Sequence, residues 1–374
     1  MQDALRHREF GSRDRRLYRE LLYTAVRYLP WIEELTVRSE AEAARAVAWL
    51  AAPAPAIQRF REALLPGWPE PPALISGRAQ HLGVNRELLP DWFRSHCPEA
   101  FASPNLEVLH TRAPIWIRLQ SPDPAAVSAE FASQGWTMRW AGVLPTAGEV
   151  LADADVTSTR AYREGRFEVQ DLGSQLVLAG ASIAPGGRWL DACAGAGGKT
   201  LQLAGLLGLG GRVDAFDVRP EALAELRVRA RRGGFANINV LERIPDDASY
   251  DGVLVDAPCS GSGTWRRAPH LKWCTTAEDV AVHAASQRQL LARFSRFVRP
   301  GGLLVYATCS LSRQENQGAI VAFRGDHPEF IAVPPVRSFG CPLDDSGLSI
   351  LPAIHNTDGF FVSSLRRGTS LDCR

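Results

Sequence analysis

The sequence predicts a parallel, doubly wound α/β sheet that follows a small helical module and a small α/β unit. From Arg188 onward, short apolar runs alternate with helical patterns and glycine-rich turns, as in sheets built with right-handed crossovers. Before that point helical periodicity comes first, and the Pro-rich residues 66–72 interrupt it. A chain of 374 residues with 45% hydrophobic residues can bury a large core, so we expect more than one domain.

The helical module is expected to span residues 1–70. Apolar residues recur at helical spacing through residues 12–29, 40–50 and 56–65, which predicts three helices. The start of the module carries six arginines that either meet phosphate or form a solvated face: Arg6, Arg8, Arg13, Arg15, Arg16 and Arg19.

Residues 71–165 are expected to hold a linker and a small α/β domain. The patterns predict strands at 114–119 and 136–140 and a helix at 124–134 between them, which together form a β-α-β unit. Three tryptophans of this unit are expected in its core, with stacking on bases as the alternative: Trp116, Trp136 and Trp140.

Residues 166–374 are expected to form the main domain, with a mostly parallel sheet of seven strands. Strands are predicted at 188–193, 212–217, 238–241, 250–255, 303–307, 330–333 and 359–363. Helices are predicted at 199–207, 221–232 and 277–298.

Composition excludes several classes of protein. No apolar run approaches the 18 or so residues of a membrane helix, and the Arg-rich start lacks the apolar region of a secretory signal, so we expect a cytoplasmic protein without membrane partners. The seven cysteines are odd in number and scattered, which argues against a disulfide framework and a structural zinc site. We therefore expect free thiols and no metal, and a monomer.

Among the 42 basic residues only two are lysines, Lys199 and Lys272. A planar guanidinium cannot replace a compact ammonium that gives up its proton, so these two positions are expected to need lysine. The net charge of +1 argues against a uniformly basic nucleic-acid binder but allows local basic patches.

A glycine-rich turn joins the first predicted strand of the main domain to the first helix. Such a turn allows a ligand close to the backbone, and the helix N-terminus offers free amides to an anionic group. Its spacing fits neither a phosphate loop nor the three-glycine dinucleotide motif. Asp217, at the end of the second strand, is placed to accept hydrogen bonds from two ribose hydroxyls, or else only caps the next helix. An adenosine cofactor with a carboxylate in place of a diphosphate fits these parts, and S-adenosyl-L-methionine is such a cofactor.

Two cysteines follow the ends of adjacent predicted strands. Cys259 lies in the segment Asp256–Gly263 and Cys309 in Tyr306–Ser310, so both thiols should face one crevice. This pair suggests pyrimidine chemistry, in which a thiolate adds to carbon 6 of cytosine and activates carbon 5 toward a sulfonium methyl. Lys199 is the candidate that favours the thiolate, and Asp256 either holds the exocyclic amine of cytosine or orients Lys199. The alternative is that both cysteines are small hydrophobic core residues.

The residues resemble a known family. The matching segments, in order, are Asp191–Thr200, Asp256–Arg267, Pro269–Trp273, Thr308–Ser310 with Gln314–Asn316, and Asp358–Phe361. Together they resemble the RNA cytosine-carbon-5 methyltransferases of the NOL1/NOP2/Sun family, in the bacterial RsmB/Sun-like branch. The resemblance implies a Rossmann-like class I S-adenosylmethionine-dependent methyltransferase domain, preceded by a NusB-like helical domain and an RNA-recognition-like insert.

The resemblance also implies roles for single residues. Cys309 corresponds to the nucleophile and Cys259 to the cysteine of product release. The cofactor-binding residues are expected to be Cys193, Ala194, Gly195, Ala196, Gly197, Gly198, Lys199, Asp217 and Asp256. Glu242 is the nearest candidate for the acid that reaches the adenine, with Asp246 next.

This chain departs from the family pattern at the first motif. Gly195-Ala196 replaces the usual Ala-Pro, which should loosen the turn without removing its amides, and the helical module is shorter than a full NusB-like domain. The expected function is methyl transfer to carbon 5 of a cytosine in RNA, with 16S ribosomal RNA favoured as the partner. Transfer RNA is the alternative substrate, and a non-catalytic ribosome-assembly or RNA-binding factor is the alternative class.

Overall fold

The computed structural model describes residues 12–53, 55–121 and 123–369. The chain folds as two compact units, which are described separately: Met1–Ala113 with Trp265–Thr276, and Pro114–Thr264 with Ala277–Arg374. Arg6 and Arg8 of the predicted basic cluster lie outside the described residues.

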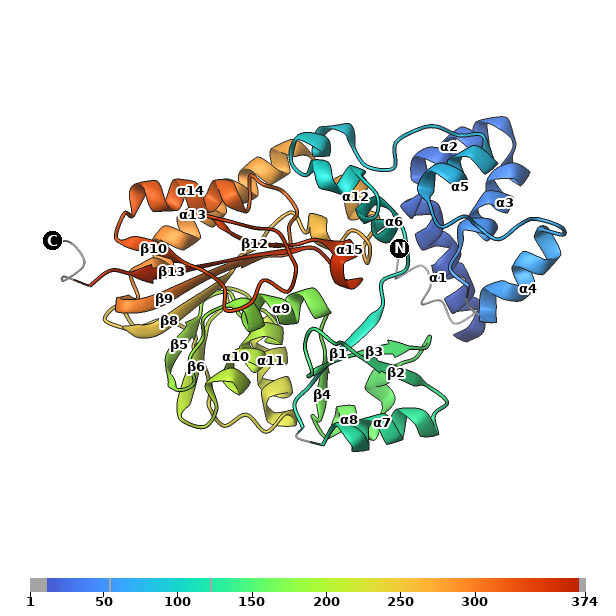
Figure 1. Ribbon diagram of the computed structural model, residues 1–374. Coiled ribbons are helices and arrows are strands. Elements are labelled where there is room, and N and C mark those ends of the chain that lie inside the picture. Colours follow the sequence, from blue (N-terminus) through green and yellow to red (C-terminus); the bar gives the residue numbers. More distant parts are fainter. Residues whose placement is uncertain (1–11, 54, 122, 370–374) are drawn as a thin grey trace. The chain divides into compact units, whose positions relative to one another are not determined.

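The first unit is helical (Figure 1). Its elements are α1 (Ser12–Arg27), α2 (Leu29–Arg38), α3 (Glu40–Leu50), α4 (Pro55–Leu64), α5 (Ile75–Leu82), η2 (Asp91–Ser95), η3 (Pro98–Phe101), α6 (Asn105–Leu109) and α12 (Leu271–Cys274). The three predicted helices correspond to α1, α3 and α4. The structure adds α2, which has Pro30 in its first turn, where the missing amide proton costs nothing.

The helical unit extends beyond the predicted limit at residue 70. Ile75 and Leu82 of α5 pack into the same core as Trp31 and Trp49. A hydrogen bond also connects this core to the loop after α5, because the Trp31 indole nitrogen donates to the carbonyl of Arg86 at 2.7 Å. A short sequence window cannot reveal this shared core, since its parts are separated by Pro-rich loops.

Residues 265–276 join this unit from far along the chain. Lys272 Nζ donates to the carbonyl oxygen of Arg27 at 2.9 Å and lies 3.0 Å from His110 Nε2. Trp265 packs against Phe93, with ring centroids 4.6 Å apart. Burial, followed by the nearby Arg27 charge, lowers the pKa of Lys272 well below its ordinary value. Within this unit the side-chain nitrogen of Lys272 caps the C-terminal end of α1 by donating to the Arg27 carbonyl.

The second unit begins with a small four-stranded sheet. Its elements are β1 (Ile115–Leu119), α7 (Pro124–Ser133), β2 (Thr137–Trp140), β3 (Ala147–Leu151), η4 (Val156–Ser158), α8 (Arg160–Arg163) and β4 (Phe167–Val169). The strand order is β2-β3-β1-β4, and every neighbouring pair is antiparallel. The predicted β-α-β unit is present, but β3 lies between its two strands, which gives the split arrangement of ferredoxin-like folds.

The three tryptophans of the small sheet differ in burial. Trp116 is buried and packs against the α/β core that follows, whereas Trp136 and Trp140 are half-buried against the core of the small sheet. The prediction of core positions is therefore confirmed for Trp116 and is correct in part for the other two.

The rest of the second unit is a nine-stranded sheet with helices on both faces. Its strands are β5 (Gly187–Asp191), β6 (Gly211–Ala215), β7 (Ile238–Val240), β8 (Tyr250–Asp256), β9 (Val298–Thr308), β10 (Phe330–Val333), β11 (Leu343–Asp344), β12 (Gly347–Ile350) and β13 (Phe360–Arg367). Its helices are α9 (Leu172–Gly180), α10 (Gly198–Leu207), α11 (Pro220–Arg232), η5 (Ser262–Thr264), α13 (Ala277–Ser295), α14 (Gln317–Asp326) and α15 (Pro352–His355).

The doubly wound α/β class is confirmed, but the sheet has more strands than predicted. Strands β7-β6-β5-β8-β9 are parallel, and β13 continues the sheet in the antiparallel direction. The short strands β11 and β12 account for the difference from seven. The helix predicted to reach residue 298 ends at Ser295, because Val298 pairs with Tyr250 as part of β9.

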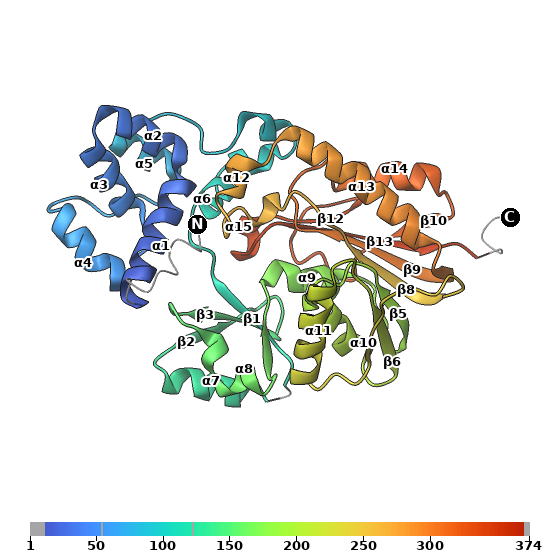
Figure 2. The same ribbon diagram turned by 180° about the vertical axis from the view of Figure 1, so that it is seen from behind.

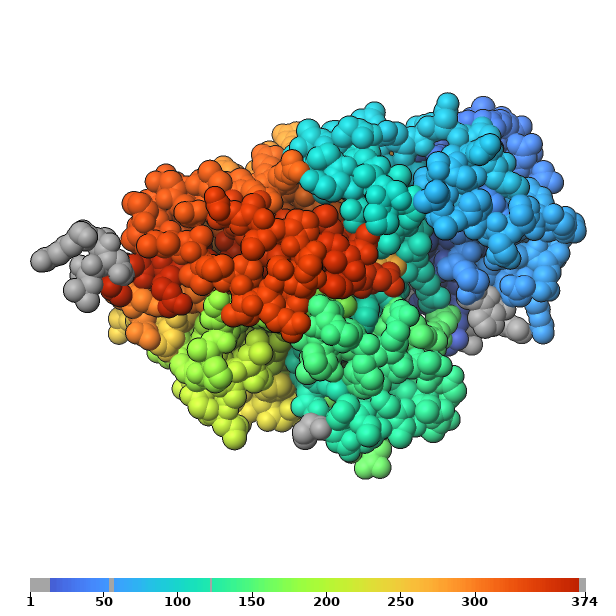
Figure 3. Space-filling model, in the orientation of Figure 1, coloured from blue at the N-terminus to red at the C-terminus, as the bar shows by residue number. Residues whose placement is uncertain are grey.

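Two cores hold the sheet between its helix layers. On one face Leu291 and Phe294 of α13 pack with Val253 of β8, and on the other Leu176 of α9 and Leu203 of α10 pack with Leu254. Figures 1 and 2 show α13 and α14 on one side of the sheet and α9, α10 and α11 on the other. In Figure 3 the orange and red C-terminal residues form a continuous surface beside the green residues of the same unit. None of the helices within the described residues is long and apolar enough to cross a membrane.

Candidate active site

A cavity of about 680 Å³ opens at the carboxyl ends of β5, β6, β8 and β9. This volume lies within the range of small-molecule sites, and the position is where doubly wound sheets bind ligands. Its lining includes ten of the predicted site residues: Cys193, Ala194, Gly195, Ala196, Gly198, Lys199, Asp217, Asp256, Cys259 and Cys309.

The glycine-rich turn forms one wall of the cavity. Gly195 has φ +51° and Gly197 has φ +91°, a left-handed region that favours glycine. Gly197 is not among the residues that line the cavity, and its cofactor-binding role stays a prediction. A Cβ on Gly197 would lie 2.8 Å from a Leu226 side-chain carbon, so this glycine lets the turn pack against α11.

Asp217 supports the turn from the neighbouring strand end. Its carboxylate accepts a hydrogen bond from the Gly195 amide at 2.8 Å and from the Arg219 amide at 2.9 Å, and the Arg219 guanidinium also contacts it. Burial opposes ionisation, but these hydrogen bonds hold the pKa of Asp217 below its ordinary value. Arg219 lines the cavity too, although no local sequence signal indicates it beyond its position two residues after Asp217.

The two acids predicted to reach the adenine do not line the cavity. Glu242 is exposed, and Asp246 is exposed and pairs with Arg243. Contact of either acid with the adenine stays a prediction. The opposite wall of the cavity instead supplies Leu290, Arg293 and Phe294 from α13.

Lys199 and Asp256 form an ion pair inside the cavity. Lys199 Nζ lies 2.9 Å from Asp256 Oδ2, and the lysine side chain is 9% exposed against 30% for the carboxylate. Burial would lower the pKa of Lys199, but the charge and hydrogen bond of Asp256 raise it, so the ammonium form is retained. The same ammonium lies 5.3 Å from the Phe360 ring centroid.

The two predicted cysteines meet beside this ion pair. Cys259 Sγ and Cys309 Sγ are 3.4 Å apart, which is hydrogen-bond distance for sulfur. This hydrogen bond, together with burial, raises the pKa of Cys259 well above its ordinary value. The same bond lowers the pKa of Cys309 against the effect of burial, and the charge of Lys199 acts in the same direction. Of the two thiols, Cys309 is therefore the one whose pKa is lowered.

A buried carboxylate beneath the cysteines connects their two loops. Glu315 accepts hydrogen bonds from the Ser260 amide at 2.8 Å and from the Ser260 and Ser310 hydroxyls. Gln287 Nε2 donates to it as well, at 3.0 Å. Because Ser260 follows Cys259 and Ser310 follows Cys309, Glu315 fixes the backbone next to both thiols. Residues 314–316 are indicated only by the family resemblance, and no local sequence pattern indicates that Glu315 is buried.

Asp191 lies at the base of the turn and is fully enclosed. Its carboxylate accepts the Thr200 hydroxyl at 2.7 Å, while burial raises the pKa of Asp191 to about 7. The described residues contain no cluster of three or more histidine, cysteine or acidic side chains that fits a metal ion.

Comparisons with known proteins identify the family of the chain. A family described as 16S rRNA methyltransferase RsmB/F matches residues 181–366. Ribosomal RNA small subunit methyltransferase B of Klebsiella pneumoniae is 30% identical over 307 residues, which cover 78% of this chain and 69% of that protein. The chain belongs to the RsmB/F methyltransferase family. Its fold and RsmB/Sun-like resemblance are thereby confirmed, and S-adenosyl-L-methionine is the cofactor of the family domain.

Other comparisons cover different shares of the chain. A putative methyltransferase of Mycobacterium tuberculosis is 40% identical over 220 residues, and the chain spans about half of its length (47%). Among solved structures, PH0851 superposes with a TM-score of 0.76 at 22% identity, covering 98% of this chain and 93% of that one. NSun6 from Pyrococcus horikoshii gives 0.68 at 19% identity, covering 75% and 97%. At these identities the structures support the fold alone.

Proposed function

We propose that the chain transfers a methyl group from S-adenosyl-L-methionine to carbon 5 of a cytosine in RNA, through a covalent adduct with Cys309. The observation that carries the proposal is the pair of sulfur atoms 3.4 Å apart on the wall of the cofactor-sized cavity. Membership of the RsmB/F family favours 16S ribosomal RNA as the substrate.

The residues of the cavity fit the cofactor. The amides at the start of α10 suit its carboxylate, and Asp217 offers acceptors at the end of β6 for ribose hydroxyls. The lining is otherwise apolar near Phe216 and Phe294, which suits an adenine ring. When bound, S-adenosyl-L-methionine supplies an electrophilic methyl group.

Cys309 is the proposed nucleophile because its pKa, unlike that of Cys259, is lowered by the contact between the two thiols and by the charge of Lys199. The thiolate forms a bond to carbon 6, and the electron pair of the carbon 5–carbon 6 double bond moves to carbon 5. Carbon 5 would then take the methyl group as the sulfur–methyl bond of the sulfonium breaks, and its electron pair would stay on the sulfur of the departing S-adenosylhomocysteine. Asp256 lies at the rim of the same cavity, where it accepts a hydrogen bond from the exocyclic amine. Lys199 pairs with Asp256 and favours the Cys309 thiolate.

Cys259 is proposed to assist release. Loss of the carbon 5 proton to a base in the crevice re-forms the carbon 5–carbon 6 double bond, and the electron pair of the sulfur–carbon 6 bond returns to Cys309. The Cys259 thiol donates a hydrogen bond to that sulfur, which stabilises the departing thiolate. A cysteine in this position therefore lowers the barrier to elimination more than the barrier to attack.

Ribosomal RNA as substrate implies a cytosine that is unpaired or extruded, because the thiols lie inside the cavity. It also implies action in the cytoplasm, where ribosomes assemble. Purified protein with methyl-labelled cofactor should place label as 5-methylcytosine in 16S ribosomal RNA, either naked or in small subunits. Label only in transfer RNA would reassign the substrate, and absence of label from both would refute the proposal. A chain that binds RNA but not the cofactor in calorimetry would be a non-catalytic factor.

A further inference from the structure

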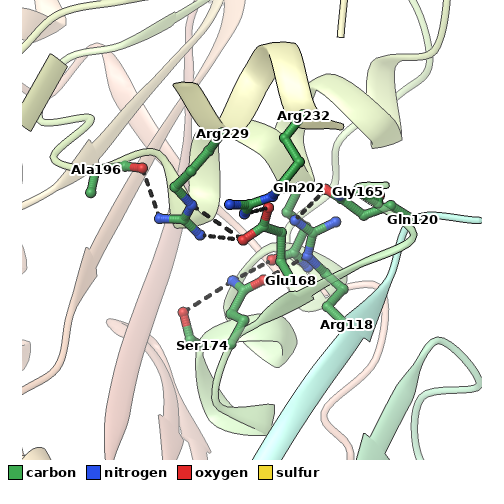
Figure 4. Close-up of polar contacts among 10 residues, drawn as sticks. Arg118, Gln120, Gly165, Glu168, Ser174, Ala196, Gln202, Arg229 and Arg232 are labelled. Carbon is green, nitrogen blue, oxygen red and sulfur yellow. Dashed lines mark hydrogen bonds and ion pairs between the residues drawn. The ribbon is translucent and has the colours of Figure 1, made fainter. Parts of the chain in front are cut away.

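A polar cluster links the small four-stranded sheet to the wall of the cofactor cavity (Figure 4). Its centre is Glu168 of β4, which is only 1% exposed. The Glu168 carboxylate accepts hydrogen bonds from Arg229 at 2.9 and 3.2 Å and from Arg232, both on α11. Figure 4 shows the two guanidinium groups on either side of this carboxylate.

Arg229 has a second partner that Arg232 lacks. Its Nη1 donates to the carbonyl oxygen of Ala196 at 2.7 Å. Ala196 is part of the glycine-rich turn and lines the cavity. One planar guanidinium therefore bridges the carboxylate of the small sheet and the backbone of the cofactor turn, a geometry that a point charge cannot reproduce.

The turn is a segment whose backbone needs such a restraint. Glycines at 195, 197 and 198 surround Ala196, so few side chains restrict the backbone dihedrals. The Ala196–Gly197 peptide is held at both ends, because the Gly197 amide donates to the Ala194 carbonyl at 2.9 Å while Arg229 binds the carbonyl of Ala196. Fixing that peptide plane fixes the direction of the amides at the start of α10.

A second route runs from the same sheet to the same cavity. Arg118 of β1 donates to the Gln170 side chain at 2.6 Å, and Gln170 donates to Ser174 at 3.2 Å and to Gln202 at 3.0 Å. Ser174 lines the cavity. The small sheet is thus joined by buried polar contacts to two separate segments of the cavity wall.

We propose that Arg229 is a positioning residue for the cofactor, which holds the glycine-rich turn in its binding conformation by anchoring the Ala196 carbonyl to Glu168 of the small sheet. The small sheet then contributes to the methyl-donor site as well as to any contact with RNA. The inference rests on the cofactor-binding part of the proposed function and not on methyl transfer.

Arg232 provides a matched control. Its side chain is 14% exposed, as is that of Arg229, and both pair with Glu168. Its other contact is with the Tyr162 ring, 4.0 Å from the centroid. Loss of either guanidinium removes one ion pair from Glu168, but only loss of Arg229 frees the turn.

The test compares Arg229→Gln with Arg232→Gln in the full chain, by calorimetric titration with S-adenosyl-L-methionine and by thermal unfolding. We expect similar losses of thermal stability in both variants but a rise in Kd of tenfold or more only in Arg229→Gln. Hydrogen exchange at the Gly197 and Gly198 amides, measured without cofactor, should accelerate only in Arg229→Gln. Arg229→Lys keeps the positive charge but reaches either Glu168 or the Ala196 carbonyl at one time. This variant should fold, and its Kd for the cofactor should rise at least threefold.

The outcomes separate the two proposals. A wild-type chain that binds no cofactor would refute the proposed function. A normal wild-type Kd together with Arg229 variants that bind as tightly as Arg232→Gln would overturn the positioning role. If Arg229→Gln does not fold, the Arg229→Lys titration decides between these outcomes.

Discussion

Replacement of Glu315 by alanine should lower the free energy of unfolding and separate the two thiols. The carboxylate accepts four hydrogen bonds, from Ser260 (amide and hydroxyl), Ser310 and Gln287, and it is fully buried. Ser262 Oγ also lies within hydrogen-bond distance of the Ser260 and Ser310 hydroxyls, at 3.3 and 3.0 Å. The substitution removes the carboxylate that the two loops share.

The magnitude follows from what happens to the four donors. The serine hydroxyls can form hydrogen bonds with one another instead. Ser310 Oγ lies 3.0 Å from Ser262 Oγ and 3.3 Å from Ser260 Oγ. Gln287 keeps its bond to the Pro258 carbonyl at 2.9 Å. The Ser260 amide is left without an acceptor, at a cost of about 1–3 kcal/mol, and the deleted side chain leaves a cavity that costs about 2 kcal/mol more. We expect a loss of about 3–5 kcal/mol in the free energy of unfolding.

The assay is urea unfolding with methyl transfer measured on the same preparations. Glu315→Ala should lower the transfer rate at least tenfold while the Kd for the cofactor changes less than threefold, because Glu315 does not line the cavity. Glu315→Gln keeps one acceptor and offers an amide to the serine hydroxyls, so it should cost only about 1–2 kcal/mol. Glu329→Ala, at a surface position 40% exposed, is the control and should stay within about 0.5 kcal/mol of wild type.

The reasoning fails if Glu315→Ala is as stable as the Glu329→Ala control. It also fails if the stability falls but the transfer rate at saturating cofactor does not.

Two further predictions concern charge. Lys199→Gln removes the ammonium that lowers the pKa of Cys309 and leaves Asp256 without its ion-pair partner. The pH midpoint of Cys309 alkylation by iodoacetamide should therefore move upward. An unchanged midpoint would contradict the role of Lys199 in favouring the Cys309 thiolate. Burial raises the pKa of Asp191 to about 7, so the folded chain binds the Asp191 proton more tightly than the unfolded chain. The free energy of unfolding gained from this proton is fully present below the ordinary carboxyl pKa and is lost as pH rises through about 7. Asp191→Asn removes this pH dependence. The free energy of unfolding of the variant minus that of wild type should therefore rise by about 2–3 kcal/mol between pH 5 and pH 8. If that difference is constant with pH, Asp191 is not buried in its neutral form.

The parallel sheet and the meeting of the cysteines could be predicted because both depend on local signals. Each strand of the parallel half is a short apolar run followed by a turn, and strands β8 and β9 each end just before a cysteine. Adjacent parallel strands bring their carboxyl ends to one edge, so the crevice follows from topology alone.

The remaining features depend on contacts between distant segments. Lys272 caps α1 from 245 residues away, and Glu315 meets Ser260 across 55 residues. Strand β4 has only three residues and β11 two, too few to show a periodic pattern. Glu242 follows the third strand of the parallel sheet, but it is exposed and does not line the cavity, which no local sequence pattern indicates.

The most direct test of the covalent mechanism compares Cys259→Ala with Cys309→Ala on labelled RNA that contains the target cytosine. Adducts are resolved on a denaturing gel in the presence of cofactor. Cys259→Ala should accumulate a covalent protein–RNA species because its leaving thiolate loses a hydrogen-bond donor, whereas Cys309→Ala should give neither adduct nor methylation. An adduct with Cys309→Ala and none with Cys259→Ala would contradict the account and exchange the roles of the two cysteines.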